Sequence, residues 1–248
     1  MKRFGQGCLL LAALGLAGLL GGCASGQSGA NNGGGAVAFE NHDPLEPFNR
    51  AMYKVNTELD RYTLKPAAEA YVHVVPQPVR TGIGNILSNL ASPVQLGNDM
   101  LEGKPQRAGD TLMRFVINST VGVLGIFDVA KRLGYPNHSA DFGVTLALWG
   151  VGNSPYLFLP VLGPGSPRDS GGRIVDIAAD PFGYVGQGVG VTAARWTRWG
   201  LNLVNQRAQY LGTFANIRKT ALDPYATFRS LYRQHRKAEI DKIRAYHH

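Results

Sequence analysis

The chain has 248 residues, two of them cysteine, and a formal net charge of +8 at pH 7. This length suits one large domain or two small ones. After residue 22 no run of eighteen apolar residues occurs, which argues against a simple transmembrane helix in the rest of the chain. The basic charge favours anionic headgroups or an acidic partner, and we expect no nucleic acid among the partners.

The first 22 residues have the layout of a bacterial lipoprotein signal peptide. A cationic start precedes a thirteen-residue apolar run, Cys8 to Leu20, which is too short to span a bilayer. Leu20-Gly21-Gly22-Cys23 then resembles a lipobox, whose cysteine accepts a diacylglycerol. We therefore expect residues 1–22 to be removed and Cys23 to be the lipid anchor. The alternative is a chance cysteine near an ordinary cleavage site. The residue after the cysteine is Ala24, whereas lipoproteins retained in the inner membrane commonly have Asp there. We therefore predict that the mature protein is located at the periplasmic side of the outer membrane.

The folded part is predicted to begin at residue 43, because residues 23–42 read as a flexible tether rich in Gly, Ser, Asn and Ala. Asp43, Pro44 and Glu46 suit the N-cap, N1 and N3 positions of a helix. Apolar residues from Phe48 to Tyr62, spaced by four and three, predict an amphipathic helix that ends near Lys65-Pro66.

Further helices are predicted along most of the chain. Their expected positions are 79–90, a short helix from Ser92-Pro93, 105–119, a long helix over 192–217, and a basic C-terminal helix or tail over 226–248. Strand signals are weak, and 144–148 is the one plausible extended run. We therefore expect an all-α domain over 43–225. The basic end is interpreted either as a solvated helix or as a surface-binding segment.

Glycine and proline interrupt short apolar runs between 122 and 190. The most apolar run starts with Pro155, Tyr156, Leu157, Phe158, Leu159 and Pro160. Proline at both ends favours either a buried segment or a re-entrant hairpin that dips into lipid and acts as a gate. Charged residues follow at Arg168, Asp169, Arg173, Asp176, Asp180 and Arg195. These six are candidates to line a lipid conduit, and the alternative for each is a surface ion pair or helix cap.

Catalytic signatures are absent from the sequence. The chain has no zinc-protease motif, no nucleophile elbow and no phosphate loop, and its internal histidines are isolated. We therefore expect neither an enzyme nor a metal site.

Several blocks resemble, in the same order, the VacJ/MlaA family of outer-membrane lipoproteins. They are residues 43–53, 75–80, 114–120, 125–130, 149–157 with Leu159-Pro160 and Arg168-Asp169, and 223–225.

The resemblance implies a ring-shaped helical protein that lies in the outer membrane beside trimeric porins. Such a protein removes phospholipids mislocalised to the outer leaflet and passes them to a soluble periplasmic carrier, which maintains lipid asymmetry. No hydrolytic activity and no cofactor are implied. The chain lacks the long acidic C-terminal tail of well-known members. A structural or scaffolding envelope lipoprotein is the main alternative, and a membrane-tethered hydrolase is a second.

Replacement of Cys23 by Ser should abolish acylation, because the thiol is the atom that accepts the diacylglycerol. Mass spectrometry of the mature N-terminus checks this. An unmodified Cys23 in the wild type, or cleavage at another position, would contradict the lipoprotein assignment.

Overall fold

Helices carry almost all of the regular structure in residues 43–152, 154–186 and 188–246, which are the residues that the computed structural model describes. The helices are α3 (Glu46–Leu59), η1 (Asp60–Leu64), α4 (Lys65–Val74), α5 (Gln77–Leu101), α6 (Pro105–Thr120), α7 (Val129–Arg132), α8 (Phe142–Leu148), α9 (Pro167–Ala179), η2 (Pro181–Gly183), α10 (Val189–Gln209), α11 (Leu211–Thr220) and α12 (Pro224–Arg244). Strands β1 (Leu157–Leu159) and β2 (Gly163–Gly165) form a small antiparallel hairpin. The helical fold class is confirmed, while Cys23 and the tether lie outside the described residues.

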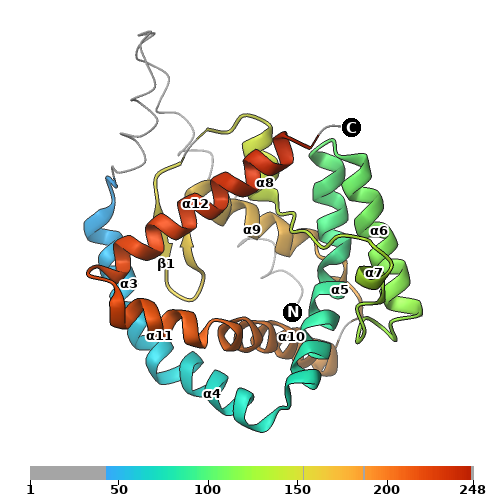
Figure 1. The fold of residues 1–248 in the computed structure, drawn as a ribbon, viewed down its shortest axis with the longest axis horizontal. Coiled ribbons are helices and arrows are strands. Elements are labelled where there is room, and N and C mark those ends of the chain that lie inside the picture. Colours follow the sequence, from blue (N-terminus) through green and yellow to red (C-terminus); the bar gives the residue numbers. More distant parts are fainter. Residues whose placement is uncertain (1–42, 153, 187, 247–248) are drawn as a thin grey trace, which may run out of the picture. The chain divides into compact units, whose positions relative to one another are not determined.

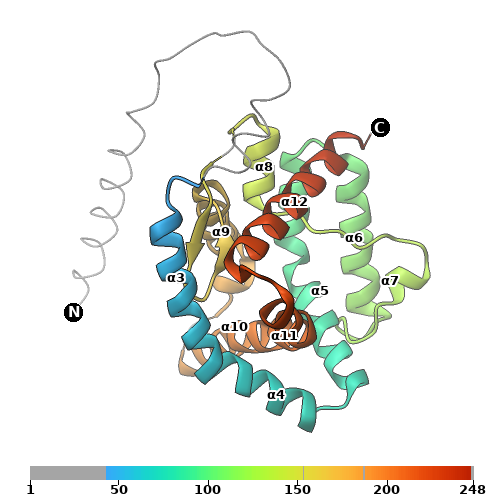
Figure 2. The same ribbon diagram turned by 60° about the vertical axis from the view of Figure 1, so that its left-hand side comes forward.

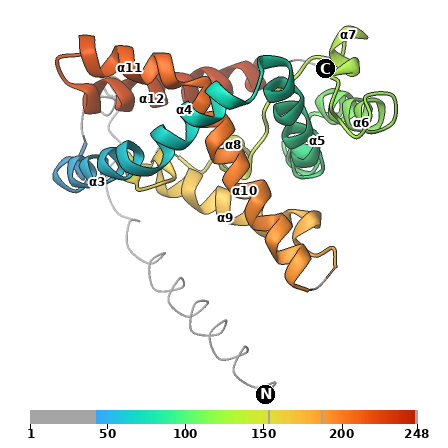
Figure 3. The same cartoon turned by 90° about the horizontal axis from the view of Figure 1, so that it is seen from below.

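Within these residues the helices follow one another around a closed circuit (Figure 1). The chain runs through α3, α4 and α5; α5 packs on α8, and α8 packs on α9. Strand β1 packs on α3, which closes the circuit, while α10 contacts both α4 and α5. Helix α6 packs along α5 on the side away from α10 (Figures 1 and 3).

The first helix does not end at Lys65-Pro66 as the sequence suggested. It passes through the π-helical turn η1 into α4, so that α3, η1 and α4 continue along one edge (Figure 2). Pro66 lies in the first turn of α4, where a missing N–H is tolerated. The π turn also directs Asp60 inward, where Arg207 Nε donates to its carboxylate at 2.6 Å and Arg218 Nη2 at 3.0 Å.

Two other helix starts differ from expectation. Pro93 lies inside α5 and does not begin a new helix, because the packing of α6 along α5 supports a continuous rod despite one lost backbone hydrogen bond. Asp43 is not the N-cap of α3, which begins at Glu46. Its buried carboxylate instead accepts hydrogen bonds from Asn49, Tyr225 and Arg229. Burial would raise the pKa of Asp43, but these donors hold it below its usual value.

The expected extended run at 144–148 is wrong, because these residues belong to α8. Asp141 caps this helix by accepting from the Val144 N–H at 3.1 Å. Seven residues are too few to show a helical period, so the short, mostly apolar run 144–148 could not be told from a strand by its pattern. The expected long helix over 192–217 is divided at Tyr210 into α10 and α11.

The C-terminal helix α12 is part of the packed structure up to its last turn. Asp223 caps it as the sequence predicted, accepting from the Ala226 N–H at 3.1 Å. Tyr225 and Ile243, near its two ends, are both buried. Arg236 donates to Asp141 and Asp169 from the middle of the helix. Burial of these residues distinguishes α12 from a fully solvated helix.

Among residues 43–152, 154–186 and 188–246, none of the helices combines the length and the apolar composition that a membrane span requires.

One buried carboxylate in the described part of the chain has no hydrogen-bond partner. Glu102, at the C-terminal end of α5, has a fully buried side chain, and the nearest cation, Arg107 Nη2, lies 3.9 Å away. Burial raises the pKa of Glu102 to about 7, with nearby Asp99, Asp141 and Glu239 adding repulsion. The folded protein therefore holds this proton at pH values where the unfolded chain has released it, and stability falls as the pH rises from about 4.5 to 7.

Replacement of Glu102 by Gln should raise the free energy of unfolding at pH 8 by about 1–3 kcal/mol, because the amide needs no proton to remain neutral. At pH 5 the difference should be small. Denaturant unfolding at the two pH values measures it, with the exposed Glu58→Gln as control. A gain of equal size at both pH values would contradict the assignment.

Candidate functional site

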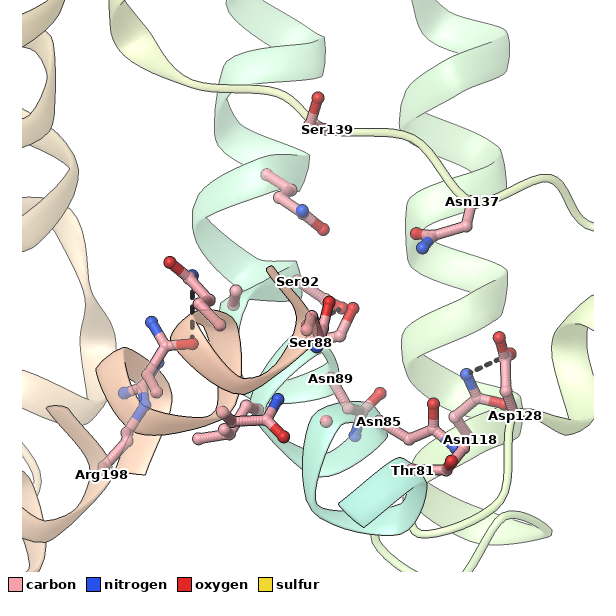
Figure 4. Close-up of a pocket in the computed structure, with 18 of the residues that line it drawn as sticks. Thr81, Asn85, Ser88, Asn89, Ser92, Asn118, Asp128, Asn137, Ser139 and Arg198 are labelled. Carbon is pink, nitrogen blue, oxygen red and sulfur yellow. Dashed lines mark hydrogen bonds between the residues drawn. The ribbon is translucent and has the colours of Figure 1, made fainter. Parts of the chain in front are cut away.

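A cavity of about 1150 Å³ lies among α5, α6, α10 and the loop around residues 137–139. Figure 4 shows side chains from α5, α6, α10 and this loop gathered around the same space. Helix α5 contributes more of the lining than any other element. The cavity is large enough to hold many water molecules or a small organic group.

The lining is dominated by neutral polar side chains. Amides and hydroxyls from α5 recur at spacings of four and three residues, which places them on one face of that helix: Thr81, Asn85, Ser88, Ser92 and Gln95. Asn118, Asn202 and Asn205 face them from α6 and α10. A wall of this kind can form hydrogen bonds with a polar group, because amides and hydroxyls offer both donors and acceptors.

Four arginines and two aspartates supply the full charges of the lining. Arg114 Nη2 donates to both oxygens of Asp128 at 3.0 Å. Arg198 Nη1 donates to Asp180 at 2.7 Å, and its Nη2 donates to the Leu90 carbonyl at 3.1 Å. Burial would raise the pKa of Asp128, but the Arg114 and Asn118 donors lower it, so this pair stays ionised at neutral pH.

Two of the six conduit candidates, Asp180 and Arg195, line this cavity. Asp180 also caps η2 by accepting from the Phe182 N–H at 3.1 Å. Arg195 is exposed and has a long contact, 3.4 Å, from Nη2 to the Gly186 carbonyl. The structure thus brings these two residues together with Arg198 across α9, η2 and α10.

The other four candidates do not line the cavity. Asp169 is buried and accepts from Arg168, Tyr232 and Arg236. Burial would raise its pKa, but the Arg236 and Tyr232 donors hold it below the usual value. Arg173 Nη1 donates to the Leu162 carbonyl at 2.7 Å, next to the hairpin.

Asp176, the last of these four, connects three elements. Its carboxylate accepts from Asn98 Nδ2 at 2.8 Å and from the Phe142 N–H at 3.1 Å. Burial is the main cause that raises the pKa of Asp176. The four side chains thus hold helices and loops in position around the cavity.

The predicted gate segment forms the hairpin and its approach. Tyr156 and Phe158 are buried against Tyr53 and Tyr225, with Met52 and Tyr232 packed around them. Burial raises the pKa of the Tyr156 phenol well above its usual value. Pro155 is exposed, while Leu157, Leu159 and Pro160 are partly buried.

Asn49 of α3 fixes this hairpin. Its fully buried amide donates to the Tyr156 carbonyl at 2.9 Å and accepts from the Phe158 N–H at 2.9 Å. Asn56, two turns further along the helix, accepts from the Val161 N–H at 2.8 Å. The segment is thus held by the core and by α3 at both ends.

Sequence reasoning missed most of the cavity wall. It singled out the apolar stripe of α5 and overlooked the polar stripe that begins at Thr81, although the spacing of the two is the same. Arg80, Arg114 and Arg198 also line the cavity and were not selected. Their contribution depends on contacts between helices that are far apart in the chain.

A model of the MlaA lipoprotein family matches residues 41–239. The chain belongs to the MlaA lipoprotein family.

Relatives in several bacteria cover most of this MlaA-family chain. A protein of Haemophilus influenzae named intermembrane phospholipid transport system lipoprotein MlaA is 37% identical over 217 residues, which cover 86% of this chain and 84% of the relative. The protein of the same name in Escherichia coli K12 is 36% identical over 220 residues, 87% of this chain and 82% of the relative. An uncharacterised protein of Rickettsia conorii is 32% identical over 217 residues, 86% of this chain and 83% of that protein.

A solved structure has the same MlaA fold. It comes from work on the structural basis for maintenance of bacterial outer membrane lipid asymmetry. It superposes with a TM-score of 0.69 at 34% identity, covering 81% of this chain and 100% of that one.

In the described ranges no group of His, Cys, Asp and Glu side chains is arranged to hold a metal ion.

Replacement of Phe158 by Ala should lower the free energy of unfolding by roughly 3–5 kcal/mol, because it empties the centre of the aromatic cluster. Leu162→Ala, at a side chain that is 45% exposed on the same hairpin, should cost less than about 1 kcal/mol. Denaturant titration of both variants checks this. If the two substitutions lower stability equally, Phe158 is not a core residue.

Proposed function

We propose that this chain is the lipoprotein that removes mislocalised phospholipids from the outer leaflet of the outer membrane and thereby maintains lipid asymmetry. The observation that carries the proposal is a large cavity with a polar wall in a chain of the MlaA family. Its relatives in Haemophilus influenzae and Escherichia coli are named for intermembrane phospholipid transport.

A phospholipid requires a polar route for its headgroup beside an apolar route for its tails. The cavity offers the polar route, through its amides, hydroxyls and arginines. Exposed apolar side chains are abundant on the same helices, among them Leu112 and Val116 of α6 and Trp196 of α10. Such groups are favourable in contact with hydrocarbon and unfavourable in water. This division supports passage of a lipid with its headgroup in the cavity.

In this mechanism Arg195 contacts the phosphate, and the Asp180–Arg198 pair fixes the wall beside it. Arg168, Asp169, Arg173 and Asp176 hold the surrounding helices, and the segment from Pro155 to Pro160 keeps the circuit closed against α3. No chemical step on the lipid is needed, so the chain acts as a transporter and not as an enzyme.

The proposal places the chain at the periplasmic side of the outer membrane, anchored through Cys23. A trimeric porin lies beside it there, and a soluble periplasmic carrier accepts the lipid. These partners follow from the resemblance of the sequence to the family.

Replacement of Arg195 by Glu should reduce phospholipid clearance at least severalfold, because it presents a negative charge to a phosphate. The measurement is the amount of phospholipid exposed in the outer leaflet, with protein level and localisation determined in parallel. Arg132→Glu, at an exposed residue of α7 outside the cavity, makes the same charge change as a control.

Normal clearance by correctly localised Arg195→Glu would remove the headgroup contact from the mechanism. Stable binding of envelope proteins without any bound phospholipid in the wild type would favour the scaffold alternative.

A further inference from the structure

The charges that line the cavity are not balanced. Asp128 is bound by Arg114, and Asp180 is bound by Arg198. The remaining lining arginines, Arg80 and Arg195, form no ion pair with a carboxylate in residues 43–152, 154–186 and 188–246. The described wall therefore carries two guanidinium groups whose charge no neighbouring acid neutralises.

Arg80 has a further property that points to a ligand. Its Nε is buried and has no hydrogen-bond partner in the described part of the chain. A buried donor without an acceptor is unfavourable, and native structures usually supply a partner from protein, water or ligand. Because Arg80 lines the cavity, an anion in the cavity can be that partner.

The two arginines approach the cavity from different helices. Arg80 lies in the first turn of α5. Arg195 lies on α10, one turn before Arg198, which reaches the carbonyl of Leu90. From Arg80 to Leu90 the rise along α5 is about 15 Å. The two arginines therefore reach the cavity from different helices, α5 and α10.

The two aspartates decide which headgroup suits this wall. A zwitterionic headgroup brings an ammonium that needs an acidic partner. Asp128 already accepts from Arg114, Asn118 and the Lys131 N–H. Asp180 already accepts from Arg198 and the Phe182 N–H. An anionic headgroup with neutral hydroxyls instead meets free cations and a wall of amides.

We infer that Arg80 is a second phosphate-binding residue of the cavity and that Arg80 and Arg195 together select anionic phospholipids, such as phosphatidylglycerol, over zwitterionic ones. The inference rests on the proposed function, and it adds the headgroup class and the residue that determines it.

Competition between lipids tests this selection. Full-length acylated protein, extracted in detergent and freed of bound lipid, is incubated with equimolar dihexanoyl phosphatidylglycerol and dihexanoyl phosphatidylethanolamine. Native mass spectrometry then gives the ratio of the two complexes. Wild-type protein should favour phosphatidylglycerol roughly tenfold, as expected for charge-assisted hydrogen bonds. Arg80→Gln should reduce this ratio severalfold, because it weakens binding of phosphatidylglycerol more than binding of phosphatidylethanolamine, whose own ammonium partly neutralises its phosphate.

Matched variants separate a phosphate contact from a structural effect. Arg80→Lys keeps the charge and should retain part of the preference, whereas Arg132→Gln removes a surface charge and should retain all of it. Circular dichroism and thermal melting check that each variant is folded. Inorganic phosphate, added as competitor, should displace phosphatidylglycerol only at much higher concentration.

Each contrary result has a distinct meaning. An unchanged ratio in Arg80→Gln, with lipid still bound, would overturn the selection by Arg80 and leave transport standing. Displacement by inorganic phosphate at equal concentration would assign the site to free phosphate and also overturn it. If wild-type protein binds neither lipid, the proposed function itself fails.

Discussion

Buried carboxylates that accept hydrogen bonds from α12 hold this fold together. The described apolar core is small, and its centre is a cluster of tyrosines and Phe158. Around it, Asp43 and Asp169 accept from Arg229 and Arg236, which lie two turns apart on α12. Charge-assisted hydrogen bonds are strong where water is excluded, and losing one partner leaves a buried charge. The C-terminal helix thus connects the start of the folded region, at Asp43, to the helix that follows the hairpin.

Ion pairs also hold the helices around the cavity in position. Carboxylates and arginines at fixed points position the helices, while the space between is lined by neutral amides and hydroxyls. A dense row of unpaired charges in the passage would bind a charged ligand tightly at one place. Amides exchange hydrogen bonds with water or a ligand at little net cost. In the proposed transport, a wall of this composition allows a headgroup to move along it, and Arg80 and Arg195 bias which headgroups enter.

The local parts of this structure follow from the sequence. Helical periodicity predicted α3 and α6, and the Asp-Pro pair at 223–224 predicted the cap that is observed at the start of α12. Prediction failed where tertiary contacts override local rules. Pro66 and Pro93 do not end their helices, because a π turn and the packing of α6 accommodate them. In the candidate site, Asp180 was found from its charge after an apolar run, and Arg195 from its place near the start of the following helix. Asp169 was chosen for the same reason as Asp180, but its partner Arg236 is 67 residues away and only the fold brings them together.

The contact between Asn49 and the hairpin has a consequence for association between chains. A two-stranded hairpin normally leaves two open edges, and an open edge is a template for a strand from another molecule. On one side of β1 lies β2; on the other, the amide of Asn49 pairs with the backbone of residues 156 and 158 as a peptide group would. One asparagine side chain therefore takes the place of a third strand. The edge of β1 that faces α3 is already occupied by Asn49. This edge therefore offers no site for aggregation by strand addition.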